Sequence, residues 1–284
     1  MTAFATMPGK ERALFASHYM SYLRERDGVP CLLTRTLSRR EAFFRRMDAE
    51  RTRAVPAPRI DRTVFVRNLR RKAPEPGLDA AMIWALAVAK GNRAERYGVE
   101  HKLERRGFEP GGAADALTYV EIQECYHTRL LLRVLSMVGL DCDVGAPVGA
   151  LTRAGVRLFG QLPRTAIDVL ALAFEVVGIA AFRAMREEAR ELFAEHPHGG
   201  HIDALFAQLL VDEVGHVHFL RSRLGAGGLA MARAALPFAK AALFDDNHEA
   251  RMLLERRGAL WGIEDIDVDG VVAGEPERLP PLAA

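Results

Sequence analysis

Two short segments carry most of the information in this chain: Glu-Cys-Tyr-His at residues 124–127 and Asp-Glu-Val-Gly-His at residues 212–216. Each places a Glu and a His three positions apart, a spacing that puts both side chains on one face of a helix about one turn apart. A carboxylate and an imidazole from one helix can then reach the same metal ion. One such pair is weak evidence because it arises by chance in many helices, but two pairs indicate a metal site.

A third acidic residue lies between the two motifs in an apolar stretch. Residues 169–182 read VLALAFEVVGIAAF, and Glu175 is the only ionisable residue among them. Burying an unpaired carboxylate costs several kcal/mol or forces the group to stay protonated. A divalent cation removes that cost by supplying the compensating charge. Glu175 is therefore a candidate metal ligand.

A fourth helix should bring one more carboxylate. Residues 80–106 have helical composition, the glycine-rich segment 107–112 breaks the helix, and a new helix can begin near Asp115. In an antiparallel helix pair, residues equally far from the turn lie at the same level. Glu95 and Glu124 are each 12 residues from the ends of that break, so Glu95 is the predicted ligand, with Glu100 as the alternative.

Helices that carry Glu, Glu-x-x-His, Glu and Glu-x-x-His in this order form the ligand set of the ferritin-like di-iron carboxylate bundles. The chain resembles that superfamily over about residues 80–225. The resemblance implies an all-α fold, a ferritin-like four-helix bundle with additional N- and C-terminal helices. It also implies six ligands for two metal ions: Glu95, Glu124, His127, Glu175, Glu213 and His216.

Asp212 extends the resemblance to the oxygen-activating branch of the superfamily, which includes ribonucleotide reductase small subunits, acyl-carrier desaturases and bacterial multicomponent monooxygenases. In that branch the Asp before the last Glu hydrogen-bonds the histidine of the other motif, which here is His127. A carboxylate in that position fixes the imidazole tautomer and makes the ligand more basic. The alternative is that Asp212 simply faces solvent beside Glu213.

The function that the resemblance implies is that of a non-haem di-iron oxygenase or oxidase. It would hydroxylate or N-oxidise a small organic substrate, including a carrier-bound natural product, using O2. Carboxylate-rich sites with two histidines suit iron, and a manganese and iron pair fits the same ligands. Electrons would come from an external reductase or ferredoxin, because the chain has no flavin or nicotinamide fingerprint. An apolar wall would exclude water from the substrate and O2 pocket, and it is predicted at Leu170, Phe174, Gly178 and Phe182.

Two departures from the superfamily bear on the reaction. Several oxygenases place a Thr near the position of Gly178, and its absence weakens a proton-delivery role here. The aryl-amine N-oxygenases, which have a similar size, carry an additional His one turn before the last Glu, where this chain has Leu209 and Leu210. The substrate class therefore stays broad.

The uneven charge keeps a different function open. Residues 1–75 contain 17 Lys and Arg against 8 Asp and Glu, although the whole chain carries a formal net charge of only +2. A basic N-terminal region favours an acidic partner, so a tRNA-modifying di-iron hydroxylase is one alternative, although nucleic acid is not the preferred partner. Solvated arginine-rich helices are the simpler explanation. A ferroxidase or iron-handling protein, and a bundle that has lost its metals, are the remaining alternatives.

Several other residues are given structural roles. Tyr126 is interpreted as a core tyrosine, with a redox role as the alternative. His218 lies about 200° around the helix from His216 and cannot share its ion. His196, His198 and His201 are placed in a loop, and residues 245–249 (DDNHE) are placed on a solvent-facing helix surface.

Composition and the positions of the glycine- and proline-rich breaks predict the domain organisation. At 284 residues and 49% hydrophobic content, the chain suits an N-terminal helical extension (1–77), a di-metal bundle (78–225) and C-terminal helices with an irregular tail (226–284). Three cysteines without a C-x-x-C pair, no secretion signal and no apolar run of 18 residues favour a cytoplasmic protein without a membrane span. A homodimer is the common assembly among similar proteins. Helices are expected at 10–26, 38–53, 78–106, 115–138, 150–160, 163–193 and 201–224, with one or two more in 229–260.

Overall fold

The computed structural model describes residues 2–50, 60–106, 115–141, 145, 148–159 and 161–280. Within these residues the protein is all-α, as predicted, apart from one short antiparallel hairpin. The hairpin pairs β1 (Pro30–Cys31) with β2 (Thr36–Leu37), and the sequence analysis did not predict it. Among the described residues Cys31 and Cys125 form no disulfide, and Cys142 lies outside them.

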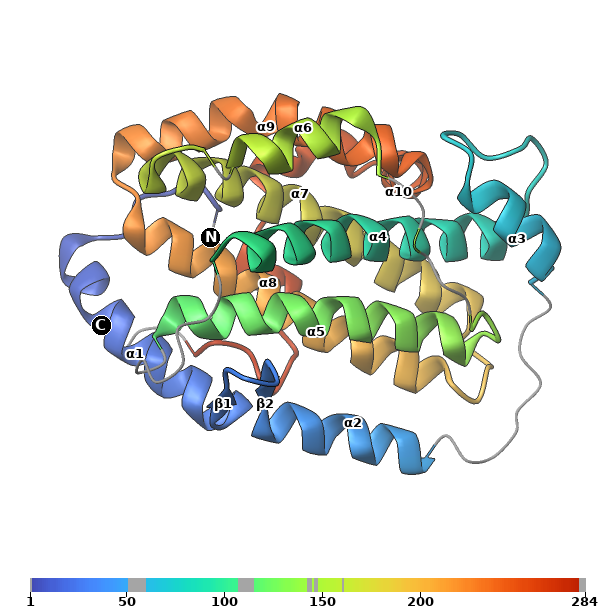
Figure 1. Cartoon of the computed structure of the whole chain (residues 1–284), viewed down its shortest axis with the longest axis horizontal. Coiled ribbons are helices and arrows are strands. Elements are labelled where there is room, and N and C mark those ends of the chain that lie inside the picture. The colour runs from blue at the N-terminus through green and yellow to red at the C-terminus, as the bar shows by residue number, and fades with distance from the viewer. Residues whose placement is uncertain are drawn as a thin grey trace.

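Four long helices form the centre of the molecule (Figure 1). They are α4 (Ala80–Arg106), α5 (Ala116–Met137), α7 (Arg164–Leu192) and α8 (Gly199–Arg223). The α4 helix packs against α5 and α7, and α8 packs against the same two helices, so the four close into a bundle. By length and composition α7 could cross a membrane, but most of its apolar stretch is buried inside the protein. It is the core helix of this bundle.

The starts of these helices follow from local sequence. The Asp115 side chain accepts a hydrogen bond from the Thr118 backbone N–H at 2.8 Å and caps α5. Pro163 precedes the first residue of α7, where a missing N–H costs nothing and the fixed φ suits a helix start. The predicted break at residues 107–112 lies outside the described residues.

The remaining helices cover two sides of the bundle. On one side α1 (Gly9–Asp27) packs against α8 and α5, and the hairpin connects it to α2 (Ser38–Glu50). Figure 1 shows α6, α9 and α10 on the opposite side. Their bounds, with those of the other short elements, are α3 Arg62–Leu69, α6 Ala150–Phe159, α9 Ala226–Asp246, α10 His248–Arg256, η1 Leu260–Asp265 and α11 Val268–Val271.

Two predictions about the C-terminal part are wrong. The tail that follows the predicted C-terminal helices (229–260) is not wholly irregular, since it contains most of η1 and all of α11. Residues 245–249 do not form a solvent-facing surface, because Asn247 and Glu249 are buried where α10 packs against α4. The Lys90 Nζ donates to both oxygens of Glu249 at 2.6 and 2.7 Å. A buried lysine needs such a counter-charge, but its partner lies 159 positions away in the chain.

Candidate metal centre

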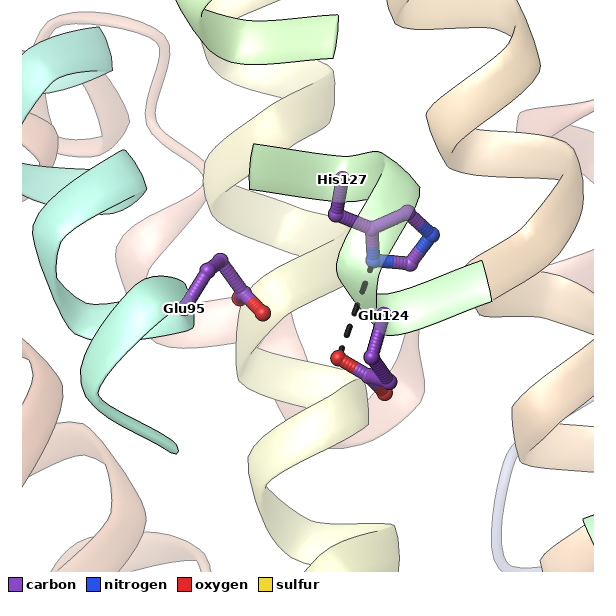
Figure 2. Close-up of side chains that lie close together, drawn as sticks. All are labelled: Glu95, Glu124 and His127. Carbon is purple, nitrogen blue, oxygen red and sulfur yellow. Dashed lines mark ion pairs between the residues drawn. The ribbon is translucent and has the colours of Figure 1, made fainter. Parts of the chain in front are cut away.

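The predicted ligands converge in the middle of the bundle. Two groups of side chains each bring their donor atoms within 4.8 Å of one another: Glu95, Glu124 and His127 form one, and Glu124, Glu175 and His216 form the other. Figure 2 shows the first group, in which Glu95 of α4 points toward Glu124 and His127 of α5. Because Glu124 belongs to both groups, one carboxylate lies between two potential ion positions.

Glu213 closes the cluster from α8. Its Oε1 atom lies 3.1 Å from His127 Nδ1, and its side chain also hydrogen-bonds Glu175. On the other side, His216 Nδ1 lies 3.4 Å from Glu124 Oε1 and 3.9 Å from Glu175 Oε2. All six predicted side chains, from four helices, therefore lie together. Their role as metal ligands stays a prediction at this point.

The structure distinguishes the two candidates on α4. Glu95 joins the cluster, whereas Glu100 is exposed and pairs with Arg96 one turn before it, at 2.7 Å. The level-matching argument for an antiparallel pair selected the carboxylate that faces inward. The polar sequence around Glu95 gave no sign of this, because one helix face can be polar while the opposite face is buried.

Both imidazoles have the same orientation. His127 Nε2 lies 3.3 Å from Asp212 Oδ2, and His216 Nε2 lies 2.9 Å from Gln123 Oε1. The Nδ1 atoms of both rings face the carboxylates, and within the described residues neither has a hydrogen-bond partner. If each Nε2 carries the proton that its acceptor requires, each Nδ1 presents a lone pair to the cluster.

These unsatisfied atoms test whether a metal fits. Buried polar atoms are nearly always hydrogen-bonded, so each exception needs an explanation. Here Glu213 Oε2 is also buried without a hydrogen-bond partner in the described part of the chain. Two imidazole lone pairs and a carboxylate oxygen are electron donors that lack an acceptor, and a divalent cation is the acceptor they have in common. The residues present fit a di-metal site.

The charges in the cluster support the same conclusion. Burial, followed by the neighbouring charge of Glu124, raises the pKa of Glu95 to about 8. Burial and Glu175 raise the pKa of Glu213 well above its ordinary value. For His127 burial acts the other way, but the neighbouring carboxylates of Asp212 and Glu213 raise its pKa well above the usual range. Without a cation, the cluster must hold extra protons to limit repulsion between its carboxylates.

Asp212 is buried beside His127 rather than exposed to solvent. Burial alone would raise its pKa, but the charges of Arg26 and Arg40 hold that pKa well below its ordinary value. Both arginines donate hydrogen bonds to Asp212 Oδ1, and Arg40 Nε also donates to Asp27 Oδ1 at 2.8 Å. Two arginines of the basic N-terminal region are thus buried counter-ions.

The sequence analysis missed four residues of this surrounding shell. Arg26, Arg40 and Asp27 lie on or beside the N-terminal helices and have no motif that ties them to the bundle. For Gln123 a signal was present: it precedes Glu124 as Asp212 precedes Glu213. Each residue immediately before a motif Glu contacts the histidine of the other motif, so the two motifs are equivalent at that position.

Tyr126 lies between two ligands in sequence but points away from them. Its hydroxyl donates to Glu41 Oε1 at 2.6 Å and accepts from the Leu37 backbone N–H at 2.8 Å. Burial, followed by the hydrogen bond with Glu41, raises the pKa of the Tyr126 phenol. These contacts join α5 to the hairpin and α2, and they favour the structural role.

We expect Tyr126→Phe to lower the free energy of unfolding by about 1–3 kcal/mol, because it leaves the buried Leu37 N–H without an acceptor. Urea denaturation of the metal-free protein measures this change. The number of metal ions bound per chain should equal that of the wild type. A variant of unchanged stability that bound fewer ions would contradict the structural role.

The predicted apolar wall is on α7, in part beside the cluster. Phe182 is buried, and its ring lies against both Gly91 of α4 and Gly178. Phe174 is half-buried and packs edge-on against Phe238 of α9, with ring centroids 6.0 Å apart. Leu170 is half-buried near the start of α7. A pocket formed by these four residues stays a prediction.

The other histidines lie apart from this cluster. His218 Nε2 is 2.9 Å from Asp269 Oδ1 of α11, so it faces away from His216 as predicted. His196 and His198 precede α8, whereas His201 lies in the first turn of that helix and not in a loop. The glycines at 199 and 200 did not prevent the helix from starting there.

Comparisons with known proteins return no match: no family model, no curated protein and no solved structure is similar to this chain.

Proposed function

We propose that this chain is a non-haem di-iron oxygenase or oxidase of the ferritin-like type, which uses O2 to hydroxylate or N-oxidise a small organic substrate. The observation that supports the proposal most directly is the orientation of His127 and His216. Each ring is fixed through Nε2, and each directs an unpartnered Nδ1 toward the carboxylates. A bundle that used these histidines only for packing would have no reason to leave both atoms unsatisfied.

The ligands that would hold the metals are the six residues of the cluster, with Glu124 shared by both positions. Bound iron would supply the chemistry of O2 reduction, for which carboxylate and imidazole ligands are suited. The chain contributes the rest. Asp212 and Gln123 fix the imidazole rings, and the buried side chain of Phe182 would be part of the apolar wall that excludes water. Electrons would come from an external reductase or ferredoxin.

A metal-loading experiment tests the proposal. Protein stripped with a chelator is loaded with Fe(II) without oxygen, the bound iron per chain is measured, and the optical spectrum is followed after O2 is added. We expect two ions per chain and a transient visible band. Protein that binds no iron would refute the proposal. A manganese and iron pair would show in the same measurement when both metals are offered together.

Two alternative functions make different predictions. A ferroxidase would oxidise many Fe(II) ions per chain, whereas an oxygenase oxidises iron only to the stoichiometry of its site. A tRNA-modifying hydroxylase would bind tRNA with an affinity that falls steeply with salt. The burial of Arg26 and Arg40 in ion pairs with Asp212 removes two basic residues of the N-terminal region from contact with phosphate, and this supports the small substrate as the first choice.

A further inference from the structure

The two histidines of the cluster are held by groups of different charge. His127 Nε2 faces the carboxylate of Asp212 at 3.3 Å, whereas His216 Nε2 faces the neutral amide oxygen of Gln123 at 2.9 Å. Both rings are fully buried, and both present Nδ1 to the carboxylates. The group behind the ring is therefore a direct difference between the two ends of the cluster.

The groups behind both rings belong to one buried network. Gln123 Nε2 donates to Asp27 Oδ2 at 2.7 Å. The other oxygen of Asp27 accepts from Arg40 Nε, and Arg40 also donates to Asp212. The network thus runs from His127 through Asp212, Arg40, Asp27 and Gln123 to His216. Within this network Asp212 contacts His127 directly, whereas the carboxylate of Asp27 reaches the Nε2 side of His216 only through Gln123.

This arrangement affects metal binding through the ligands. A carboxylate that accepts a hydrogen bond from a histidine increases electron density on the opposite ring nitrogen and strengthens the bond to a metal. A neutral amide does so less. The two arginines both donate to Asp212 Oδ1, which fixes the carboxylate and leaves its Oδ2 for His127.

We infer that the two metal positions are inequivalent: the position of Glu95, Glu124 and His127 binds a divalent ion more tightly and fills before that of Glu124, Glu175 and His216. This inference rests on the proposed di-metal site and specifies its order of loading. Asp212 and Gln123 act as positioning residues that set the affinity of each position through its histidine. The position that contains His127 has the higher metal affinity because the carboxylate of Asp212 lies behind its ring, whereas a neutral amide lies behind His216.

Cobalt(II) titration of the metal-free protein without oxygen tests the inference, with calorimetry for affinity and visible absorption for the coordination of each ion. The wild type should bind two ions in two separate steps. Asp212→Asn removes the charge behind His127 and should weaken the first step by about 10- to 100-fold, the usual effect of losing such a partner. The second step should change little.

A charge-conserving double variant provides the complementary test. Gln123→Glu combined with Asp27→Asn moves one negative charge next to His216. A hydrogen bond between positions 27 and 123 remains possible with its direction reversed, because the amide donor is then at position 27 and the carboxylate acceptor at position 123. The second step should tighten by about tenfold, and the gap between the steps should narrow. Because the net charge of the network is preserved, this variant tests the inference even if Asp212→Asn does not fold. Glu100→Gln, on the exposed face of α4, is the control.

Each outcome has a distinct meaning. Two cobalt ions bound with equal affinity, or an Asp212→Asn variant that weakens both steps alike, would overturn the inference but leave the di-metal site intact. An unchanged second step in the double variant would also overturn it. Wild-type protein that binds no cobalt would refute the proposed function as well. Stepwise binding with selective effects of the two variants would support both.

Discussion

Replacing Glu124 with alanine is expected to abolish binding of both metal ions, whereas replacing Glu95 with alanine should leave one ion bound. The reason is that Glu124 belongs to both groups of donor atoms, while Glu95 belongs to one. Without Glu124, each position keeps one carboxylate and one histidine of its group. Without Glu95, the position of Glu175 and His216 keeps its three donors. Metal analysis after loading with Fe(II) or Mn(II) and desalting measures the difference.

Glu121→Ala is the matched control for Glu124, because it removes a half-buried carboxylate one turn earlier on the same helix and lies outside both groups. It should bind as many ions as the wild type. Glu100→Ala serves the same purpose for Glu95. If the Glu124 variant still held one ion, the carboxylate would not be shared between two positions. If Glu100→Ala lost an ion, the ligand on α4 would have been misassigned.

The metal-free protein is expected to lose stability as the pH rises from 5 to 8. Glu95 has a pKa of about 8 in the folded protein against an ordinary value of 4.5, and the pKa values of Glu213 and His127 are raised as well. Between these limits the folded state keeps protons that the unfolded state releases. For Glu95 the free energy of unfolding then falls by about 1.4 kcal/mol per pH unit. Glu213 acts in the same direction, and His127 adds to the fall above its ordinary pKa of 6.5.

Urea denaturation in the presence of a chelator, at a series of pH values, measures this slope. Saturating Mn(II) should raise the stability at pH 8 more than at pH 5 and so flatten the curve, because the cation replaces the protons. Glu95→Gln should stabilise the metal-free protein at pH 8 by removing one repulsive charge, and Glu100→Gln should not. Stability of the metal-free protein that was constant or rising over this pH range would contradict the electrostatic account.

The bundle helices could be read from sequence because their patterns are local. The expected helix at 163–193 is Arg164–Leu192 in the structure, and that at 115–138 is Ala116–Met137. Such helices are specified by apolar periodicity and by end signals such as Asp115 and Pro163. The convergence of the six candidate ligands could be predicted for a similar reason. The two Glu-x-x-His motifs fix the inward faces of α5 and α8, Glu175 fixes that of α7, and Glu95 follows from its level opposite Glu124.

The rest depends on contacts between residues distant in the chain. Arg26 reaches Asp212 across 186 positions, and Lys90 reaches Glu249 across 159. No local pattern distinguishes these buried charges from the many exposed ones. For the same reason the polar sequence at residues 245–249 predicts a solvent-facing surface. The burial of Asn247 and Glu249 depends on partners such as Lys90 that are distant in the chain.

The contacts of α1 have a consequence for synthesis of the protein on the ribosome. Arg26 is translated early, but its buried partner Asp212 follows 186 residues later, and Glu277, whose backbone oxygen accepts from Tyr22 and whose side chain accepts from Arg26, follows after 251. The first helix therefore cannot complete its contacts until the segment around Glu277 has been synthesised. Chains that stall or are cleaved before that segment should expose α1 to proteases and chaperones, so the yield of native protein depends on its synthesis.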